Sequence, residues 1–589
     1  MTSEPPLSFE EARERLRLRG YLDRGVEGAV LKGALAARTR TRGLLRAAFL
    51  AALLLAFALA AVQAVLIAFG SGLPPLDAAA IFFWLFGLAL VFGAVVVAVL
   101  MGIAWARGRT RRDADEVTAE IGVAFGLAAG AFAALAAAPA LEAAGATGVG
   151  ALLLAVAFLV FLSVRIARSV TLTVLVTSGR AVLERRHRTG AVAALSVALL
   201  AAAGAWVVTA KRGGEARPEE PLVVPASASR VLLIGVDGWS DGFVPPGSPG
   251  LGPGSPYRKD GTDPAAFWTT VATGEGAARH GVGALDLVRV RGLSEPVKPA
   301  AGTGWYLRSL LPALGLARQE SATSASRRVP AIWEVAQRAG IPAAVVGWWT
   351  TYPASGPATV LSNHLFFAAR AGSPLVGEGW PVEAATRAAA FASRTMPAAG
   401  TADRLAADAQ GLDAFAARAF LDLWERERPR LGLVYLPGLD ILASALADLE
   451  RSPADKVVLA RALSVEAERV RLFLALPLPG GEADLRLLLL DGGRHERSGR
   501  VVASGPLAAR TPTAGLRPAD VAPTALAAMG IPAARDLEGH VVPDLLVKGI
   551  ATSATSATVA TWGRKDLSIP PPIDPKEYVE NLRSLGYLK

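Results

Sequence analysis

The stretch Arg230–Trp239 reads RVLLIGVDGW and is the best guide to the fold of the second half of the chain. Every residue from Val231 to Val236 is apolar or glycine, and the run ends at Asp237. A strand that is apolar at successive positions is buried on both faces, as strands are in parallel sheets covered by helices. The stretch therefore predicts a central strand with a carboxylate at its carboxyl end.

Similar runs follow downstream and alternate with helical patterns. Strands are expected at 230–236, 341–349, 431–436, 485–490 and 500–503, and helices at 330–338, 454–472, 518–529 and 575–585. This alternation predicts an α/β domain over 230–589, in which helices sandwich a mostly parallel sheet. The Gly- and Pro-rich segment 240–260 is expected to be a mobile loop.

The first half of the chain has a different character. The whole chain of 589 residues is 52% hydrophobic and only 19% charged, with a mean hydropathy of +0.39. The apolar excess lies in five uncharged stretches, at 47–69, 78–105, 121–141, 149–164 and 191–210. A membrane-spanning helix needs about 20 apolar residues. We therefore predict an all-α transmembrane domain of five helices over 47–210, with a cytoplasmic segment at 1–46 and a linker at 211–229. Ala-rich soluble core helices are the alternative, but these stretches would give them no charged face toward water.

The charges between these stretches predict the topology. Ten Lys and Arg residues precede the first stretch, four lie in 106–120 and six in 165–190, whereas 70–77 and 142–148 contain none. Basic loops remain on the cytoplasmic side of a membrane. The N-terminus is therefore expected inside, and the C-terminal domain outside the cytoplasm, in the periplasm. No ionisable residue lies within a stretch, so the helices are expected to act as an anchor in the lipid bilayer.

Charge and cysteine content exclude several classes of function. The net charge of +10 arises mainly in residues 1–217, where 23 Lys and Arg oppose 14 Asp and Glu, while 218–589 is nearly balanced. No basic surface for nucleic acid is therefore expected. The chain has no cysteine, which excludes disulfides and thiolate chemistry.

Three predicted strands end beside an aspartate: Asp237, Asp440 and Asp491. One such residue is usually a turn residue or a helix cap. The carboxyl ends of parallel strands share one edge of a sheet, however, and ligands bind outside that edge. Carboxylate oxygens gathered there are typical ligands of a divalent metal ion.

Motifs in a fixed order add a resemblance: IGVDGW (Ile234–Trp239), FWTTVATG (Phe267–Gly274), RHGV (Arg279–Val282), AIWEVAQRAGIPAAVVGWWTTYPA (Ala331–Ala354), LVYLPGLD (Leu433–Asp440), DVAPTALAAMGIPAARDLEGHVV (Asp520–Val542) and SLGYL (Ser584–Leu588). On these motifs the domain resembles the sulfatase-like alkaline phosphatase superfamily, and most of all its type I phosphodiesterase/nucleotide pyrophosphatase branch. The resemblance covers about residue 230 to the C-terminus and implies a hydrolase of phosphoesters or sulfate esters with two zinc ions.

The resemblance also implies the site residues. Asp237, Asp440, Asp491 and His495 would be the metal ligands. Thr262 would be the nucleophile, although its spacing is two residues longer than in the Thr-Phe-Pro-Asn form of the motif. Thr269, Thr270 and Thr273 would shape the loop and cap a helix.

The chain departs from the family pattern at both metals. Ser444 stands where a histidine is expected four residues after Asp440, and Gly492 replaces the histidine of Asp-His-Gly. His280, His364 and His540 fall at family positions that are not ligands, and His187 lies in a predicted cytoplasmic loop.

Three hypotheses remain open. The domain is a phosphodiesterase- or phosphatase-like hydrolase with a reduced metal site, or a catalytically inactive module that binds a ligand or protein partner. The third is a transferase of phosphoethanolamine or phosphoglycerol type, acting on lipid head groups, which rests on the combination of five helices with an outer domain.

Overall fold

The computed structural model describes residues 73–106 and most of 229–588. Gaps in the second range are 244–250, 253, 300–305, 357, 393–399, 510–511, 551–557 and 566–574. Scattered residues at 53–71 and 157–165 are also described. The chain forms two compact units. One comprises 1–213 with 288–318, and the other comprises 214–287 with 319–589.

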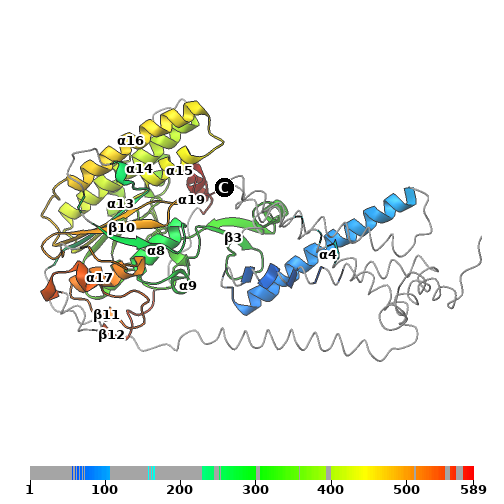
Figure 1. Ribbon diagram of the computed structural model, residues 1–589, viewed down its shortest axis with the longest axis horizontal. Coiled ribbons are helices and arrows are strands. Elements are labelled where there is room, and N and C mark those ends of the chain that lie inside the picture. Colours follow the sequence, from blue (N-terminus) through cyan, green and yellow to red (C-terminus); the bar gives the residue numbers. More distant parts are fainter. Residues whose placement is uncertain are drawn as a thin grey trace, which may run out of the picture. The chain divides into compact units, whose positions relative to one another are not determined.

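The second unit contains a mixed α/β core built on an eight-stranded sheet (Figure 1). The strand order is β2-β10-β9-β1-β8-β5-β6-β7. The five central strands from β9 to β6 are parallel, while β10, β2 and β7 pair antiparallel at the two edges. The strands are β1 (Val231–Asp237), β2 (Ser255–Arg258), β5 (Ala343–Val346), β6 (Thr359–Leu361), β7 (Gly379–Trp380), β8 (Leu431–Leu436), β9 (Leu485–Asp491) and β10 (Ser498–Ser504). The predicted mostly parallel sheet between helices is thus confirmed.

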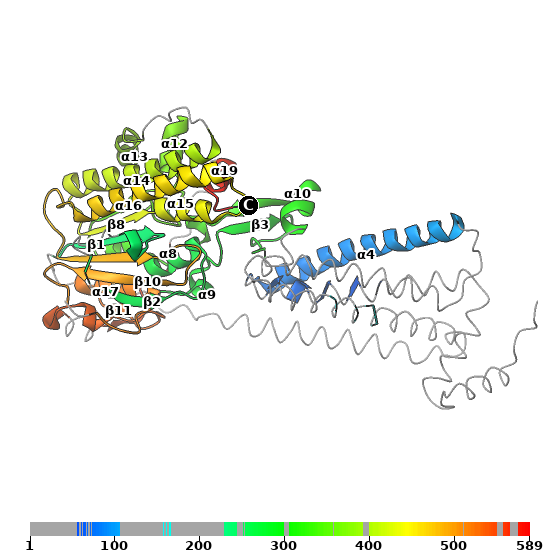
Figure 2. The ribbon, with the colours of Figure 1, turned by 45° about the horizontal axis from the view of Figure 1, so that its top comes forward.

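Helices cover both faces of this sheet (Figure 2). One layer holds α12 (Leu365–Ala371), α13 (Val382–Ala389), α14 (Thr401–Arg426), α15 (Gly438–Ala447) and α16 (Pro453–Ala475). The other holds α8 (Pro264–Thr273), α11 (Ile332–Arg338) and α17 (Val521–Ala528). The shorter α9 (Ala277–His280), the C-terminal α19 (Pro575–Ser584) and the strand pair β11 (Ala533–Ala534) and β12 (Thr558–Val559) complete this unit.

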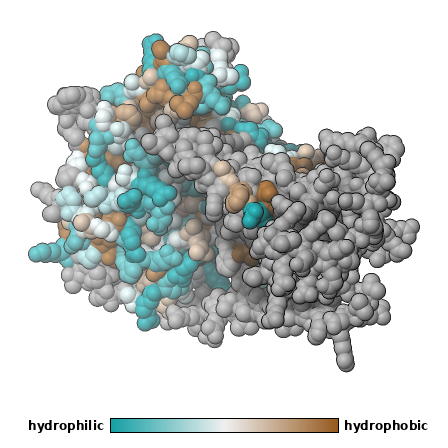
Figure 3. Space-filling model, turned by 45° about the vertical axis from the view of Figure 1, so that its right-hand side comes forward, coloured by the Kyte–Doolittle hydropathy of each residue, from teal (hydrophilic) through white to brown (hydrophobic). Residues whose placement is uncertain are grey.

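Alternate residues of each central strand explain the two layers. In β1, Val231 and Leu233 pack in the core with α8, α11 and α17, whereas Leu232 and Ile234 pack with α14 and α16. All four side chains are buried. The continuous apolar run therefore contributes side chains to the hydrophobic core on each face of the sheet. On the face drawn in Figure 3, the described residues are mostly hydrophilic or neutral, and apolar residues gather in small groups.

The segment expected to be a mobile loop, 240–260, contains regular structure. Its described residues include a short 3-10 helix, η1 (Asp241–Phe243), and the edge strand β2, which pairs antiparallel with β10. The segment is so rich in Gly and Pro that its sequence pattern does not predict a strand at the four residues of β2. The strand matters because it places Tyr257 and Lys259 beside the ends of the central strands.

The first unit contains α4 (Pro75–Ala106), which overlaps the second predicted membrane stretch. Among the described residues, one helix is long and apolar enough to cross a membrane, namely residues 75–95 of α4. The stretch 47–69 is described only in part, 149–164 at a few positions, and 121–141 and 191–210 fall outside the described residues.

Residues 288–318, called the excursion below, interrupt the α/β unit in the sequence and belong to the first unit. The chain enters it near β3 (Asp286–Val290) and leaves near β4 (Ala317–Ser321), and these two strands form a two-stranded sheet. Between them lie the π-helical turn η2 (Tyr306–Leu310) and the short α10 (Leu311–Ala313). Apolar side chains of the excursion, including Val288, Val290 and Leu307, pack with Ile67, Ile81 and Leu85. The Asp77 carboxylate accepts hydrogen bonds from the Ser294 and Glu295 backbone amides at 3.0 and 2.8 Å.

Candidate functional site

The three aspartates predicted at strand ends lie together in the α/β unit. Asp237 and Asp491 end the neighbouring parallel strands β1 and β9, where they are register partners. Asp440 lies in the first turn of α15, directly after β8. All three are buried, with exposed fractions of 2% or less. Three carboxyl groups therefore share one buried place at the carboxyl edge of the sheet.

Two glycines permit this close approach. Gly238 and Gly493 follow β1 and β9 in the left-handed region, with φ of 81° and 82°. A Cβ atom at Gly238 would lie 2.3 Å from the Asp440 backbone nitrogen, and one at Gly493 would lie 2.4 Å from Asp440 Oδ1. Residues with side chains would clash at both positions and adopt this backbone at a cost. The two turns can therefore close around Asp440.

Asp491 is neutralised by Lys259, which directly follows the edge strand β2. Lys259 Nζ lies 2.5 Å from Asp491 Oδ1 and also donates to the Gly493 carbonyl at 2.8 Å. The Gly493 amide donates to the same carboxylate oxygen at 2.9 Å, and the Tyr257 hydroxyl donates to Oδ2 at 3.1 Å. Lys259 is itself buried, 5% exposed, so this is an ion pair removed from water.

Asp440 is neutralised by an arginine from the turn after β9. Arg494 donates from Nε to Asp440 Oδ2 at 2.7 Å and from its backbone amide to Oδ1 at 2.8 Å. The same guanidinium donates to the Gly586 carbonyl at 2.6 Å, and its carbon lies 4.1 Å from the centre of the Tyr587 ring. Arg494 therefore joins the acidic cluster to the C-terminal residues.

Among the described residues, no cationic side chain forms a salt bridge with Asp237. Its Oδ2 accepts hydrogen bonds from Trp268 Nε1 at 2.9 Å and from the Tyr435 hydroxyl at 2.7 Å. Burial, reinforced by the nearby charges of Asp440 and Asp491, raises the pKa of Asp237 well above its usual value. Asp237 and Asp491 influence each other's pKa, which fits a proton shared between these two carboxyl groups.

The residues present do not fit a pair of metal ions. Five of the six carboxyl oxygens already accept hydrogen bonds from N–H or O–H groups of this chain. Lys259 and Arg494 place positive charge where a cation would need to bind. Within the described residues, no three His, Asp or Glu side chains are arranged to hold a metal ion.

The two positions at which the resemblance predicts histidines, 444 and 492, are occupied differently. A Cβ at Gly492 would lie 2.5 Å from Glu496 Oε2, so this carboxylate occupies the space of a side chain at 492. The Ser444 hydroxyl on α15 is buried and has no hydrogen-bond partner in the described part of the chain. Neither position offers an imidazole to the acidic cluster.

His495 and Thr262 are not part of the hydrogen-bonded cluster. His495 is exposed on the turn between β9 and β10, and no hydrogen bond or ion pair among the described residues joins it to an aspartate. Thr262 directly precedes Asp263, whose carboxylate caps α8 through the Ala266 amide at 3.0 Å. Among the described contacts, none joins the Thr262 hydroxyl to the three aspartates.

The other expected polar residues lie within the framework. Thr269, Thr270 and Thr273 lie inside α8, where Thr270 and Thr273 donate hydrogen bonds to backbone carbonyls one turn earlier. The His280 ring contacts the Thr270 hydroxyl at 3.0 Å, and burial lowers the pKa of His280 to about 4. His364 Nδ1 is paired with Glu378 Oε1 at 2.8 Å. These contacts fix loops and helix ends.

Sequence reasoning missed Lys259 and Arg494, the residues that decide the chemistry of the site. Lys259 lies in the segment expected to be a loop, and Arg494 lies beside His495, which the resemblance implies as a metal ligand. One signal was available: two histidines were missing from an acidic cluster, and three carboxylates buried without a metal need compensating cations.

No family model matches the chain, and neither does any curated protein.

Proposed function

We propose that this protein is a membrane-anchored binding protein, whose extracytoplasmic domain resembles alkaline phosphatases but does not hydrolyse esters. One observation carries the proposal: Lys259 and Arg494 bind the aspartates that would otherwise hold metal ions. An ammonium group and a guanidinium group neutralise the buried carboxylates without creating an open coordination position or activating a water molecule.

Metal binding and hydrolysis by the full-length protein in detergent test this proposal. We expect no zinc or manganese to be retained at micromolar concentrations, and no metal-dependent cleavage of bis(p-nitrophenyl) phosphate or p-nitrophenyl sulfate. The matched pair of variants is Asp491→Asn, inside the cluster, and Asp241→Asn, an exposed aspartate soon after β1. Stoichiometric metal binding, lost in Asp491→Asn but kept in Asp241→Asn, would establish the hydrolase hypothesis instead.

The gathering of three carboxyl groups at the strand ends is the observation that favours the hydrolase as the second candidate. In that case the cations would have to leave their carboxylates before any metal entered. A transferase acting on lipid head groups has the same requirement. Both candidates therefore predict that metal ions displace Lys259 and Arg494, which zinc-dependent shifts in the NMR signals of these side chains would reveal.

We further propose that the domain is held outside the cytoplasm by five membrane-spanning helices, with the N-terminus inside. Support comes from the alternation of basic loops and from α4, where Phe83, Val91, Val95 and Val99 are more than half exposed. Exposed apolar side chains along a long apolar helix suit contact with lipid.

The absence of cysteine makes the topology testable with single substitutions. Thr147→Cys is expected to react with a membrane-impermeant maleimide added to intact spheroplasts, and Thr110→Cys and Ser178→Cys only after lysis. The opposite pattern would reverse the orientation, and labelling of all three from outside would remove the five-helix proposal.

A further inference from the structure

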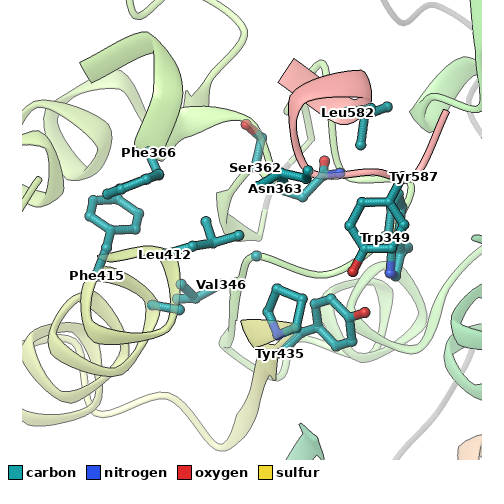
Figure 4. Close-up of a pocket in the computed structure, with 14 residues that line it drawn as sticks. Val346, Trp349, Ser362, Asn363, Phe366, Leu412, Phe415, Tyr435, Leu582 and Tyr587 are labelled. Carbon is teal, nitrogen blue, oxygen red and sulfur yellow. The ribbon is translucent and has the colours of Figure 1, made fainter. Parts of the chain in front are cut away.

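The cavity beside the strand ends leaves no room for an organic ligand. It lies at the carboxyl ends of β5 and β8, between α12, α14 and the C-terminal residues (Figure 4). Its volume is about 30 Å³. A cavity of roughly 10–15 Å³, measured in the same way, holds one water molecule, so this one has room for a water molecule or two. A larger partner of this part of the domain would bind to the outer surface.

Helix α16 exposes large apolar side chains along its length. It lies beside α14 on one face of the sheet, where it buries Leu459 and Val470 (Figure 1). On its outward face, Val457 is 72% exposed, Val465 41% and Leu472 53%. The neighbouring α14 is longer and is described at every residue, and it exposes no large apolar side chain. Exposed apolar side chains that gather on one surface mark a site of contact with a partner.

The outward face of α16 carries a regular line of five exposed side chains. Successive members are four, four, three and four residues apart: Val457, Arg461, Val465, Glu468 and Leu472. Residues at such spacings lie on one side of an α-helix. The line therefore forms an apolar contact surface that includes one positive and one negative charge.

This line is symmetric about a point between positions 464 and 465. Arg461 and Glu468 lie at equal distances on either side of that point, and so do Val457 and Leu472. In a pair of α16 helices that cross this point antiparallel, each Arg461 faces Glu468 of the other copy, and each Val457 faces Leu472. Mutual contacts of this kind define an interface with two-fold symmetry.

The charges favour the antiparallel pair over a parallel one. Parallel pairing would place Arg461 against Arg461 and Glu468 against Glu468 of the other copy, and such like charges repel. Among the described residues, Arg461 forms no salt bridge, whereas Glu468 is paired with Arg471 at 2.6 Å. Arg469 lies 3.7 Å from Glu466 of its own helix. Arg461 is thus the cation of this face that has no carboxylate within its own chain, and the antiparallel pair supplies one.

The middle of the line permits two helices to approach closely. Ala460 and Ser464 are exposed there, and both side chains are small. The Ser464 hydroxyl donates a hydrogen bond to the Ala460 carbonyl at 3.1 Å, so it remains satisfied when the face is covered. Packed helices lie about 8–10 Å apart, depending on the side chains between them. At the two ends of the line, the same symmetry brings Pro453 against Leu476, another exposed apolar residue.

From the symmetry of this face we infer that the protein forms a dimer through two antiparallel copies of α16. The contact extends over 453–476, about 35 Å at 1.5 Å per residue. Two helices alone bury less than the roughly 1,200 Å² of a standard interface, so we expect a weak dimer with a dissociation constant of about micromolar or higher. The inference goes beyond the proposed function and does not depend on it: metal-dependent hydrolysis would overturn that proposal and leave the dimer untouched.

Single cysteines test the dimer, because the chain contains none of its own. Full-length Ser464→Cys protein in detergent has its thiols beside the two-fold axis, and we expect disulfide-linked dimers under mild oxidation. Thr386→Cys, at an exposed position in α13, is the matched control and is expected to remain monomeric. Equal yields of dimer from the two variants would overturn the inference.

A mixture of two further variants tests the antiparallel register. Val457→Cys and Leu472→Cys bring their thiols together across the interface, whereas two copies of either variant alone have their thiols about 22 Å apart along the helix axis. A disulfide joins residues whose Cα atoms are about 4.4–6.8 Å apart, so we expect the mixture to cross-link and each variant alone to stay monomeric. Cross-linking of either variant with itself at the yield of the mixture would overturn the antiparallel arrangement.

Charge reversal tests the pairing of Arg461 with Glu468. Each of the changes Arg461→Glu and Glu468→Arg, combined with Ser464→Cys, places like charges in contact and is expected to lower the yield of dimer about threefold or more. Mixing the two variants restores opposite charges at both ends of the interface and should recover the yield. Both positions are exposed, and unchanged thermal unfolding confirms that the fold is intact. A yield that does not fall in the separate variants, or does not recover in the mixture, would contradict the paired charges.

Discussion

Asp237 and Asp491 lie in register on adjacent parallel strands. Within the part of the chain that the structure describes, Asp491 forms a salt bridge with the buried Lys259 and Asp237 forms none. Parallel pairing brings the two carboxyl groups to the same side of the sheet edge. Because Asp237 is buried and close to the charges of Asp440 and Asp491, its pKa is raised and its protonated form is favoured. The carboxyl groups of the cluster are therefore compensated by cations of the same chain and need no metal ion. This leads to predictions that differ from those for a metal site.

Removal of the lysine is expected to destabilise the fold strongly. Lys259→Met keeps the length of the side chain but leaves buried carboxylates without their cation, which costs roughly 3–5 kcal/mol when one partner of a buried pair is removed. Thermal or denaturant unfolding of the full-length protein measures the loss. Arg258→Met, at the exposed neighbouring position, is expected to change the free energy of unfolding by less than about 1 kcal/mol. Recovery of the Lys259→Met variant by added zinc would argue for a metal site.

The pH dependence of Asp237→Asn reports the shared proton. Since the folded-state pKa of Asp237 is raised, its contribution to stability is fully present below about pH 4 and is lost as the pH rises through the folded pKa. The amide of asparagine can donate in place of this proton at every pH. The variant should therefore gain stability relative to the wild type as the pH rises above about 4, as measured by thermal unfolding. A large loss at all pH values would show that a charged carboxylate is required at this position.

A second buried acid pair lies beneath the start of α15. Asp413 of α14 accepts a hydrogen bond from the Gly438 amide at 2.9 Å. Burial raises the pKa of Glu466 of α16 to about 7, although Arg469 opposes the shift. Burial and the neighbouring Glu466 raise the pKa of Asp413 well above its usual value.

Glu466→Gln is expected to remove a pH-dependent loss of stability. In the wild type, the protonated Glu466 contributes stability below about pH 4.5, and this contribution disappears as the pH rises through about 7. The variant should become the more stable protein above pH 7, by at most roughly 3 kcal/mol. Glu468→Gln, at an exposed position on the same helix, is the control. Because the pKa of Glu468 is lowered by its hydrogen bond with Arg471, this change should leave the profile around pH 7 unchanged. Parallel profiles for the wild type and Glu466→Gln would contradict the buried pair.

Arg494→Gln is expected to loosen the C-terminal residues. The guanidinium connects Asp440 to the Gly586 carbonyl and lies over the Tyr587 ring. Without it, amide hydrogen exchange at 585–588 should accelerate about tenfold or more, while exchange in the central strands changes less. Arg497→Gln, at an exposed position in the same turn, should leave exchange at 585–588 as in the wild type. Unchanged protection in Arg494→Gln would mean that α19 alone holds this segment.

The sequence predicts the sheet well because its strands are continuously apolar. The runs at Val231–Val236 and Leu485–Leu490 consist almost entirely of apolar residues. The parallel pairing of these strands then brings Asp237 and Asp491 to the same edge of the sheet. The sequence analysis does not predict the long helix α14, Thr401–Arg426, although the buried residues of this helix recur at helical spacing from Leu405 to Trp424. The Ala-rich composition of this segment made its apolar face less obvious.

The ionic partners could not be predicted for a physical reason. The contact of Lys259 with Asp491 joins residues 232 positions apart, and it depends on the antiparallel pairing of β2 with β10. Arg494 reaches Asp440 because Gly493 turns the backbone at a positive φ. Neither arrangement has a local pattern, since a basic residue in a turn is usually solvated. The membrane topology follows from composition and remains a prediction.

The excursion at 288–318 has a practical consequence for work with a water-soluble form. A chain truncated to begin near residue 214 would retain Val290, Leu293 and Leu307 while losing Ile67 and Ile81, against which they pack. Such a fragment would expose the apolar side chains of this hairpin to solvent and would therefore self-associate. Replacing 291–316 by a short turn between β3 and β4 should give a fragment that stays monodisperse.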